Sequence, residues 1–135
     1  MDTNQTKRVA LVTGANKGIG LETARQLAQQ DFPVLLGARE EARGREAEAK
    51  LRAEGLDAHF IHLDVDRPET HETARKFVEE RFGRLDALIN NAAIAIDQMD
   101  GEKLVPAGET PLEIYRKTFE TNFFGVIAVT QAFLL

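Results

Sequence analysis

The chain has 135 residues, of which 43% are hydrophobic and 29% are charged, and its formal net charge is −5 at pH 7. These values predict one soluble domain, residues 1–135, and the acidic balance argues against a nucleic-acid partner, which would need a basic surface. The sequence contains no cysteine, which excludes disulfides and thiolate metal sites.

Neither end of the sequence predicts a membrane segment or secretion. The first residues, MDTNQTKR, lack the apolar core of a secretory signal. The last apolar run, TFETNFFGVIAVTQAFLL, is interrupted by Glu120, Asn122 and Gln131, whereas a membrane span needs roughly 18 apolar residues. We therefore expect a cytoplasmic protein with no membrane partner.

Strand-like and helix-like segments alternate along the chain. Apolar runs predict strands at KRVALVTG (7–14), FPVLLGA (32–38), DAHFIHLDV (57–65) and RLDALINNA (84–92). Helical spacing predicts helices between them over 18–30, 39–55 and 68–83. This alternation predicts an α/β fold with a doubly wound parallel sheet, truncated after the fourth βα unit.

The last third of the chain predicts a loop followed by one long helix. Gly101, Pro106 and Gly108 indicate a loop over 94–109. The following TPLE predicts a capping box, with Thr110 as the cap and Pro111 at the first helical position. The helix places one set of residues on a shared stripe that we expect to be buried: Leu112, Tyr115, Phe119, Asn122, Val126, Val129 and Phe133.

A glycine-rich turn, TGANKGIG, follows the first strand. Gly14, Gly18 and Gly20 allow a tight turn and a close approach of backbone N–H groups to a phosphate. Glycines also form such turns where nothing binds. The strand before the turn and the helix after it favour a diphosphate site in a Rossmann-type fold.

The second strand ends in GARE. Arg39 there can accept a ribose 2′-phosphate in a forked geometry, and Lys17 adds a second positive charge. Two alternatives remain: Arg39 is simply solvated, or Glu40 serves as the acid that binds the ribose hydroxyl of NAD(H). The pattern favours NADP(H) over NAD(H).

The three histidines do not form a predicted metal site. His59 and His62 fall on opposite faces of a strand, and His71 lies near a helix start, with no carboxylates at ligand spacing. We expect all three at the surface or at a rim, and we expect no metal.

Four motifs, TGANKGIG, LDV, LINNA and TNFFG, follow one another in the order and spacing of the short-chain dehydrogenase/reductase family. The chain resembles the classical type and, most closely, its carbonyl-reductase-like members. The resemblance covers essentially all 135 residues and matches the N-terminal half of a family member. It implies hydride transfer between NADPH and a small carbonyl or alcohol substrate in the full-length form, and packing of the last helix against its counterpart in a second subunit. The bare edge of the fourth predicted strand can also pair with another chain, so we expect a homo-oligomer through the last helix or the sheet edge.

The resemblance also implies roles for particular residues. Asp64 and Val65 would contact the adenine end of the cofactor, and the NNA motif would lie beside the cofactor and brace the sheet. Ala93 stands where the family has a glycine, and alanine tolerates a positive φ poorly. The implied cofactor-binding residues are Thr13, Gly14, Asn16, Lys17, Gly18, Ile19, Gly20, Arg39, Asp64, Val65, Asn90, Asn91 and Ala92.

Asn122 matches the asparagine of the family's catalytic tetrad, which helps to hold a water in a proton relay. A buried asparagine can also merely fix packing. The tetrad's other members have no counterpart: the sequence has no serine, and its single tyrosine, Tyr115, is followed four residues later by Phe119 instead of a lysine. We predict that Tyr115 is a core residue and that the 135-residue chain alone is inactive. A non-catalytic dinucleotide-binding module and an assembly protein that uses an exposed sheet edge stay open as alternatives.

Overall fold

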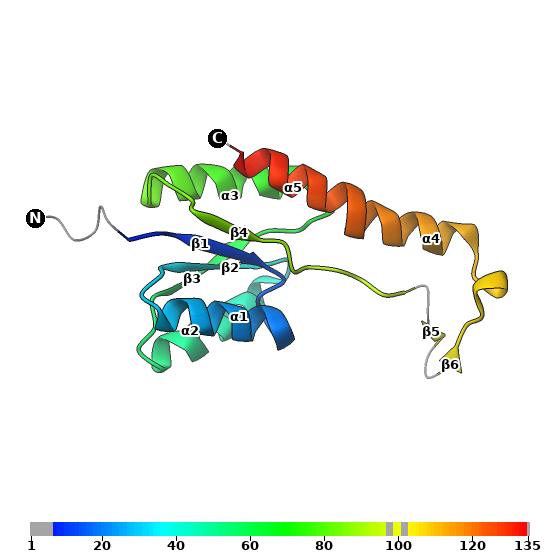
Figure 1. Cartoon of the computed structure of the whole chain (residues 1–135), viewed down its shortest axis with the longest axis horizontal. Coiled ribbons are helices and arrows are strands. Elements are labelled where there is room, and N and C mark those ends of the chain that lie inside the picture. The colour runs from blue at the N-terminus through cyan, green and yellow to red at the C-terminus, as the bar shows by residue number, and fades with distance from the viewer. Residues whose placement is uncertain (1–6, 97–98, 101–102, 135) are drawn as a thin grey trace, which may run out of the picture.

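The computed structural model describes residues 7–96, 99–100 and 103–134. Its centre is a parallel four-stranded sheet with the order β3-β2-β1-β4 (Figure 1). The strands are β1 (Ala10–Thr13), β2 (Val34–Ala38), β3 (Ala58–His62) and β4 (Ala87–Ile89). The chain moves outward from β1 through β2 and β3, then crosses to the other side of β1. The predicted doubly wound fold is thus confirmed, and the strand order reverses between β1 and β4.

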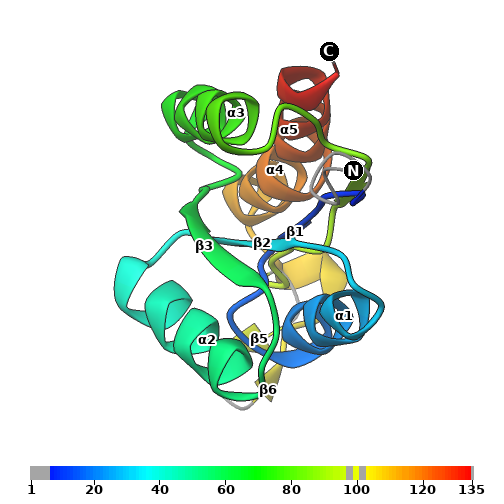
Figure 2. The same cartoon turned by 90° about the vertical axis from the view of Figure 1, so that its left-hand side faces the viewer.

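Helices cover both faces of the sheet, as Figures 1 and 2 show. The helices α1 (Gly18–Gln29) and α2 (Glu41–Ala53) lie on one face, and α3 (Pro68–Arg81) and α5 (Val126–Phe133) lie on the other. Successive strand residues point to opposite faces, so Leu11 and Leu35 belong to the core under α3 and α5. Val12 and Leu36 belong to the second core, under α1 and α2. Strands buried on both faces explain the continuous apolar runs in the sequence.

Glycine and proline set several of the helix ends. Pro68 occupies the first helical position of α3, where its missing N–H costs nothing. Gly55 and Gly83 follow α2 and α3 with φ of 81° and 71°. Glycine adopts this left-handed conformation without strain, which explains why both helices end close to the predicted ends at 55 and 83.

The end of the chain differs from the prediction. The expected loop contains a short antiparallel pair, β5 (Met99–Asp100) and β6 (Lys103–Leu104), and the 3₁₀ helix η2 (Ala107–Glu109). The expected single helix is a rod of three parts: α4 (Leu112–Phe119), the π-helical turn η3 (Glu120–Gly125) and α5. In Figure 1, α4 and the β5–β6 pair project beyond the sheet.

The predicted buried stripe of this rod was wrong over its first half. Val129 and Phe133 are buried, but Leu112 and Phe119 are 62% and 60% exposed. Helical spacing identifies residues that share a face, but it does not reveal whether another element covers that face. Because α4 extends past the sheet, its apolar side remains open.

Three local predictions also need correction. Helix α4 begins at Leu112 with Pro111 as its N-cap, and the hydroxyl of Thr110 donates to the carbonyl of Pro106, so the capping box was misplaced. Strand β4 ends at Ile89, before the NNA motif, because Asn91 bonds to Thr13 at the end of β1 and to Gly14 in the turn after it. His71 is 2% exposed instead of lying at the surface.

Two findings bear on membranes and metals. Within the described ranges, no helix is both long enough and apolar enough to cross a membrane. The same residues contain no cluster of three or more histidine, aspartate or glutamate side chains suited to a metal ion.

Candidate functional site

A hollow of about 290 Å³ lies at the carboxyl ends of the strands, where the strand order reverses. Its walls come from the turns that follow all four strands of the sheet and from the π-helical turn η3. The lining residues are Gly14, Lys17, Arg39, Leu63, Asp64, Val65, Asp66, Asn91, Ala92, Ala93, Ile94 and Thr121. Four segments that the sequence analysis selected separately therefore meet at one place.

The glycine turn after β1 is shaped by close packing. Gly14 and Gly18 have φ of 61° and 59°. A Cβ added to Gly20 would lie 2.3 Å from the carbonyl oxygen of Gly14 and 2.5 Å from Nδ2 of Asn91. Packing alone therefore demands glycine at position 20, whether or not a ligand binds.

The N-terminus of α1 is suited to an anion. Its N-cap residue, Lys17, makes no side-chain capping bond, and its first turn contains no acidic residue. The first N–H groups of a helix lack partners within the helix and carry a partial positive charge. A phosphate placed there would receive hydrogen bonds from the backbone.

Thr13 and Asn91 join the turn after β1 to the turn after β4. Thr13 is 1% exposed, and its hydroxyl accepts the N–H groups of Asn91 and Ala92 at 3.0 Å each. Nδ2 of Asn91 donates to the carbonyls of Thr13 and Gly14 at 3.1 Å each. These hydrogen bonds fix the two turns relative to each other, and both turns line the hollow.

The other predicted residues lie at varied distances from the hollow. Asn90 donates from Nδ2 to the Thr130 hydroxyl of α5 at 3.1 Å. Ile19 is 79% exposed and lines neither this hollow nor a second hollow nearby, which is described below. Ala93 lines the hollow without strain, since Asp31 is the only non-glycine residue with a positive φ in the described part of the chain.

A second hollow of about 500 Å³ shares Lys17 with the first. It also contains Asn16, Gly18, Arg43 and Lys50. Sequence analysis overlooked Arg43. It follows Arg39 by four residues, so both lie on the same side of the predicted helix, and this spacing could have indicated Arg43 as a second cation near the site.

The ion pairs around these hollows affect the cofactor alternatives. Nε of Arg43 lies 3.1 Å from Oε2 of Glu40. Glu40, the alternative acid for NAD(H), is therefore already engaged with a cation. Lys17 and Arg39 form no ion pair with any residue that the structure describes.

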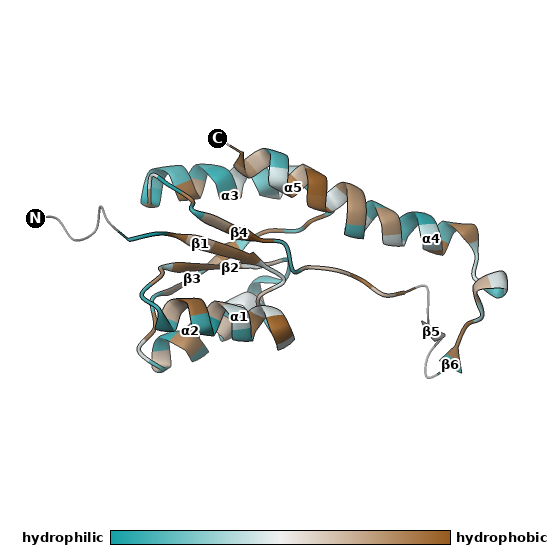
Figure 3. Ribbon diagram, in the orientation of Figure 1, coloured by the Kyte–Doolittle hydropathy of each residue, from teal (hydrophilic) through white to brown (hydrophobic). Residues whose placement is uncertain are grey.

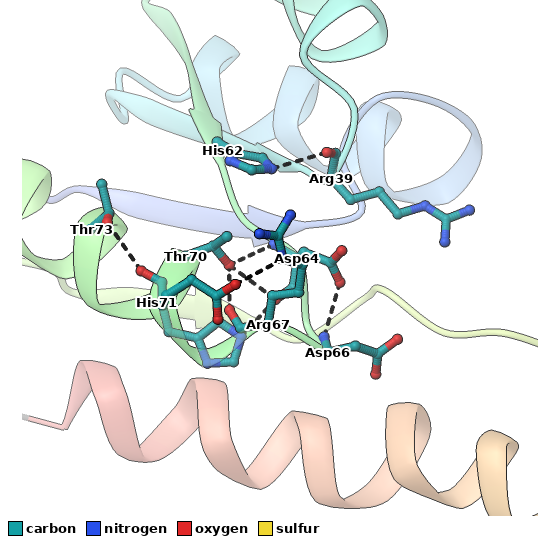
Figure 4. A network of polar contacts seen from close by, with 9 residues as sticks. Arg39, His62, Asp64, Asp66, Arg67, Thr70, His71 and Thr73 are labelled. Carbon is teal, nitrogen blue, oxygen red and sulfur yellow. Dashed lines mark hydrogen bonds and ion pairs between the residues drawn. The ribbon is translucent and has the colours of Figure 1, made fainter.

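The turn after β3 is held by the first turn of α3 (Figure 4). The backbone N–H of Asp64 donates to the Thr70 hydroxyl at 3.0 Å, and the Asp64 carbonyl lies 2.7 Å from Nε2 of His71. A carbonyl only accepts, so Nε2 carries the hydrogen. The buried histidine thus anchors the backbone of a predicted site residue.

The charge of nearby Arg67 is compensated. Its Nε donates to Glu69 at 2.8 Å. The pKa of the Glu69 carboxyl lies below its ordinary value, first because its own backbone N–H bonds to it and second because of Arg67. Arg67 is therefore less suited to binding an anionic ligand than Lys17 or Arg39.

Asn122 holds the chain segment that follows β4. Its Oδ1 accepts the N–H of Ile94 at 2.8 Å, and its Nδ2 donates to the Ile94 carbonyl at 2.7 Å. Tyr115 is half-buried on α4, and its hydroxyl donates to the carbonyl of Ala107 at 3.0 Å. Tyr115 is therefore tied to the projecting part of the molecule, and the prediction of a core position was wrong.

The fold and the site together define a family. The family model for short chain dehydrogenase matches residues 8–135, and the chain belongs to this family, as the motifs predicted. It is 42% identical over 133 residues to carbonyl reductase (NADPH) 1 of Mus musculus, covering 97% of this chain and 45% of the mouse protein. It is 44% identical over 120 residues to carbonyl reductase (NADPH) 3 of Rattus norvegicus, covering 87% of this chain and 40% of the rat protein.

Solved structures agree with this assignment. A variant of actinorhodin polyketide ketoreductase with NADPH superposes with a TM-score of 0.85 at 36% identity, covering 96% of this chain and 47% of that chain. Menthone neomenthol reductase from Mentha piperita gives 0.82 at 32% identity, covering 96% and 55%. The chain thus spans less than half the length of the carbonyl reductases that it matches.

Proposed function

We propose that this chain forms the cofactor-binding part of an NADPH-dependent oxidoreductase that transfers hydride between NADPH and a carbonyl or alcohol substrate. The observation that carries this proposal is the glycine turn beside two cations, Lys17 and Arg39, at the point where the strand order reverses. The names of the mouse and rat relatives, which specify NADPH, support it.

The residues at the site fit the parts of this cofactor. The N–H groups at the start of α1 would hold the diphosphate, and Lys17 and Arg39, which form no ion pair among the described residues, would hold the 2′-phosphate. Asp64 and Val65 would contact the adenine. The nicotinamide supplies the hydride when the cofactor is bound. Asn91 and Ala92 would lie beside the cofactor, and Asn122 would support the wall at Ile94.

Isothermal titration of the 135-residue chain with NADPH and NADH tests the cofactor assignment. We expect NADPH to bind at least about tenfold more tightly, because forked contacts with a phosphate contribute well over 1 kcal/mol. Arg39→Ala should remove most of that preference. Arg81→Ala is the control. Arg81 lies at the C-terminal end of α3, away from the hollow, so this variant should retain the preference for NADPH. Equal affinities of the unmodified chain for both nucleotides would overturn the NADPH assignment.

We further propose that these 135 residues bind the cofactor without reducing carbonyl compounds. The sequence has no serine. The hydroxyl of its one tyrosine, Tyr115, donates to the carbonyl of Ala107, beyond the end of the sheet. Absorbance at 340 nm with NADPH and a carbonyl substrate should therefore stay constant. Turnover at an ordinary enzymatic rate would contradict this, whereas tight binding without turnover also fits the alternative of a non-catalytic binding module.

Assembly with a second copy is proposed through the rod or the open side of β4. The rod carries exposed apolar side chains, Phe119, Phe123, Phe124 and Ile127, which are 60%, 53%, 54% and 41% exposed. Figure 3 shows hydrophobic residues along this rod as well as in the strands. Exposed apolar patches of this kind favour association. Sedimentation velocity over a range of concentrations should show species larger than the monomer.

A further inference from the structure

The π-helical turn η3 contacts two walls of the main hollow. Asn122 holds Ile94 on one wall, as described above. The Thr121 hydroxyl lies 2.8 and 3.0 Å from the two carboxylate oxygens of Asp66 on the other. Beside them, a Cβ on Gly125 would lie 2.4 Å from Cγ1 of Val65. Single π turns within α-helices often occur at functional sites.

Thr121 is a buried donor that faces an exposed acceptor. Its residue is 5% exposed, whereas Asp66 lies at the rim of the hollow. A hydroxyl has one hydrogen, so it bonds to one carboxylate oxygen at a time. In the described part of the chain, Asp66 forms no ion pair, so Thr121 is the side chain that fixes its carboxylate.

The bond to Asp66 also reaches Asp64. The backbone N–H of Asp66 donates to Oδ1 of Asp64 at 3.0 Å (Figure 4). Helix α3 holds the backbone of Asp64, and η3 holds the side chain of Asp66. The turn is thus fixed from two different helices, and the orientation of the Asp64 carboxylate depends on both.

We propose that Thr121 is a positioning residue for the adenine end of the cofactor, acting through Asp66 on the turn that carries Asp64 and Val65. This inference rests on the proposed function. A wall that is already fixed before binding costs no further conformational entropy when the ligand binds. The hydrogen bond from Thr121 to Asp66 should therefore strengthen binding. Asn122, the next residue, positions the opposite wall through its two hydrogen bonds to Ile94. One helical turn thus positions both walls of the hollow.

The test measures binding of NADPH and of adenosine 2′,5′-bisphosphate, which contains only the adenine half, by isothermal titration of the full 135-residue chain. Thr121→Val should weaken both ligands by the same factor, about three- to tenfold, which is the usual effect of one hydrogen bond. Thr121→Ser retains the hydroxyl and should restore binding. Asp66→Ala should give the same loss, and the double variant should lose no more than either single variant.

Two controls separate positioning from general stability. Thr118→Val removes the same group from α4, where the hydroxyl donates to Ile114 at 2.8 Å, and should leave both affinities unchanged. Asn122→Ala should weaken NADPH more than the bisphosphate. If Thr121→Val fails to fold, Asp66→Ala decides the matter, since Asp66 is exposed.

The outcomes are distinguishable. If the unmodified chain binds neither ligand, the proposed function fails, and this inference falls with it. If the unmodified chain binds both but Thr121→Val and Asp66→Ala bind as tightly, only the role of Thr121 is overturned.

Discussion

The two edges of the sheet are finished in different ways. At β3, helix α2 provides Glu48, whose carboxylate accepts the N–H of Phe60, and Arg52, whose Nε donates to the Ala58 carbonyl at 2.8 Å. At β4, no further strand among the described residues pairs with the outer side, and its three residues are only half-buried. A bare edge can pair with another chain. One edge is therefore closed by the chain itself, whereas no strand among the described residues covers the outer side of the other.

The closed edge depends on how closely α2 approaches β3, and Gly44→Leu should have the largest effect on stability. A Cβ at this position would lie 2.2 Å from the Phe60 ring, over which the Arg45 guanidinium lies at 5.0 Å. In an exposed helix, replacing glycine should stabilise. Here we expect a loss of about 2–3 kcal/mol in the free energy of unfolding, measured in urea, because the helix must move away.

Gly108→Leu is the matched control, since a Cβ there meets nothing within 4 Å. It should change stability by less than about 0.5 kcal/mol. An unchanged or increased stability of the Gly44 variant would show that α2 does not need this close approach.

The hydrogen bonds of the same edge should have the next largest effect. The Glu48 side chain is 13% exposed and also lies 3.5 Å from Arg45 and from Arg52. Glu48→Ala leaves the N–H of Phe60 without its partner, and we expect a loss of about 1–2 kcal/mol. Glu46→Ala removes an exposed carboxylate from the same helix and should have almost no effect. Similar losses for both variants would mean that edge closure adds nothing to stability.

Local patterns were sufficient to predict much of the fold from the sequence. The apolar runs identified β1 to β4, and the glycine turn and NNA motif identified segments that the structure brings together at one site. These features depend on neighbours in the sequence, which alternation and helical spacing describe directly. Boundaries were less accurate, because the NNA segment leaves the sheet to bond with the end of β1 and the turn that follows it.

The missed features depend on which elements lie next to each other. Nothing in the spacing of Glu48 shows that the N–H of Phe60 would lack a strand partner, because that follows from β3 being an edge. His71 and Thr121 were overlooked as supports of the turn after β3 for the same reason. The exposure of Phe119 likewise follows from where the sheet ends beneath the rod.

Substitutions on the exposed apolar side of the rod should affect self-association more than folding. The rings of Phe123 and Phe124 are in edge contact, with centroids 5.2 Å apart. Phe124→Glu should weaken self-association at least about tenfold, because it places a charge in the apolar contact, and sedimentation velocity measures this. Gln131→Glu adds the same charge at another exposed position of the rod and is the control. A chain that remains monomeric at all concentrations would contradict the proposed contact.

The smallest effect is expected where β4 is attached to β1. Oδ2 of Asp86 accepts the N–H of Val9 at 2.8 Å and the Nε of Arg84 at 2.8 Å. The Arg84 hydrogen bonds are the main cause that lowers the pKa of Asp86, and the Val9 N–H adds to it. The stabilisation is therefore fully present above the unfolded pKa of about 4 and is lost as the pH falls through the lower folded value.

At pH 7, Asp86→Asn should cost less than about 1 kcal/mol, because the ion pair is near the surface. Thermal unfolding at pH 7 and near pH 3 tests this, and the difference between variant and unmodified chain should shrink at the lower pH. A difference that stays constant with pH would show that the negative charge of Asp86 does not contribute to stability. Since this carboxylate joins β4 to its inner neighbour, its loss should also leave self-association unchanged, unlike the loss of Phe124.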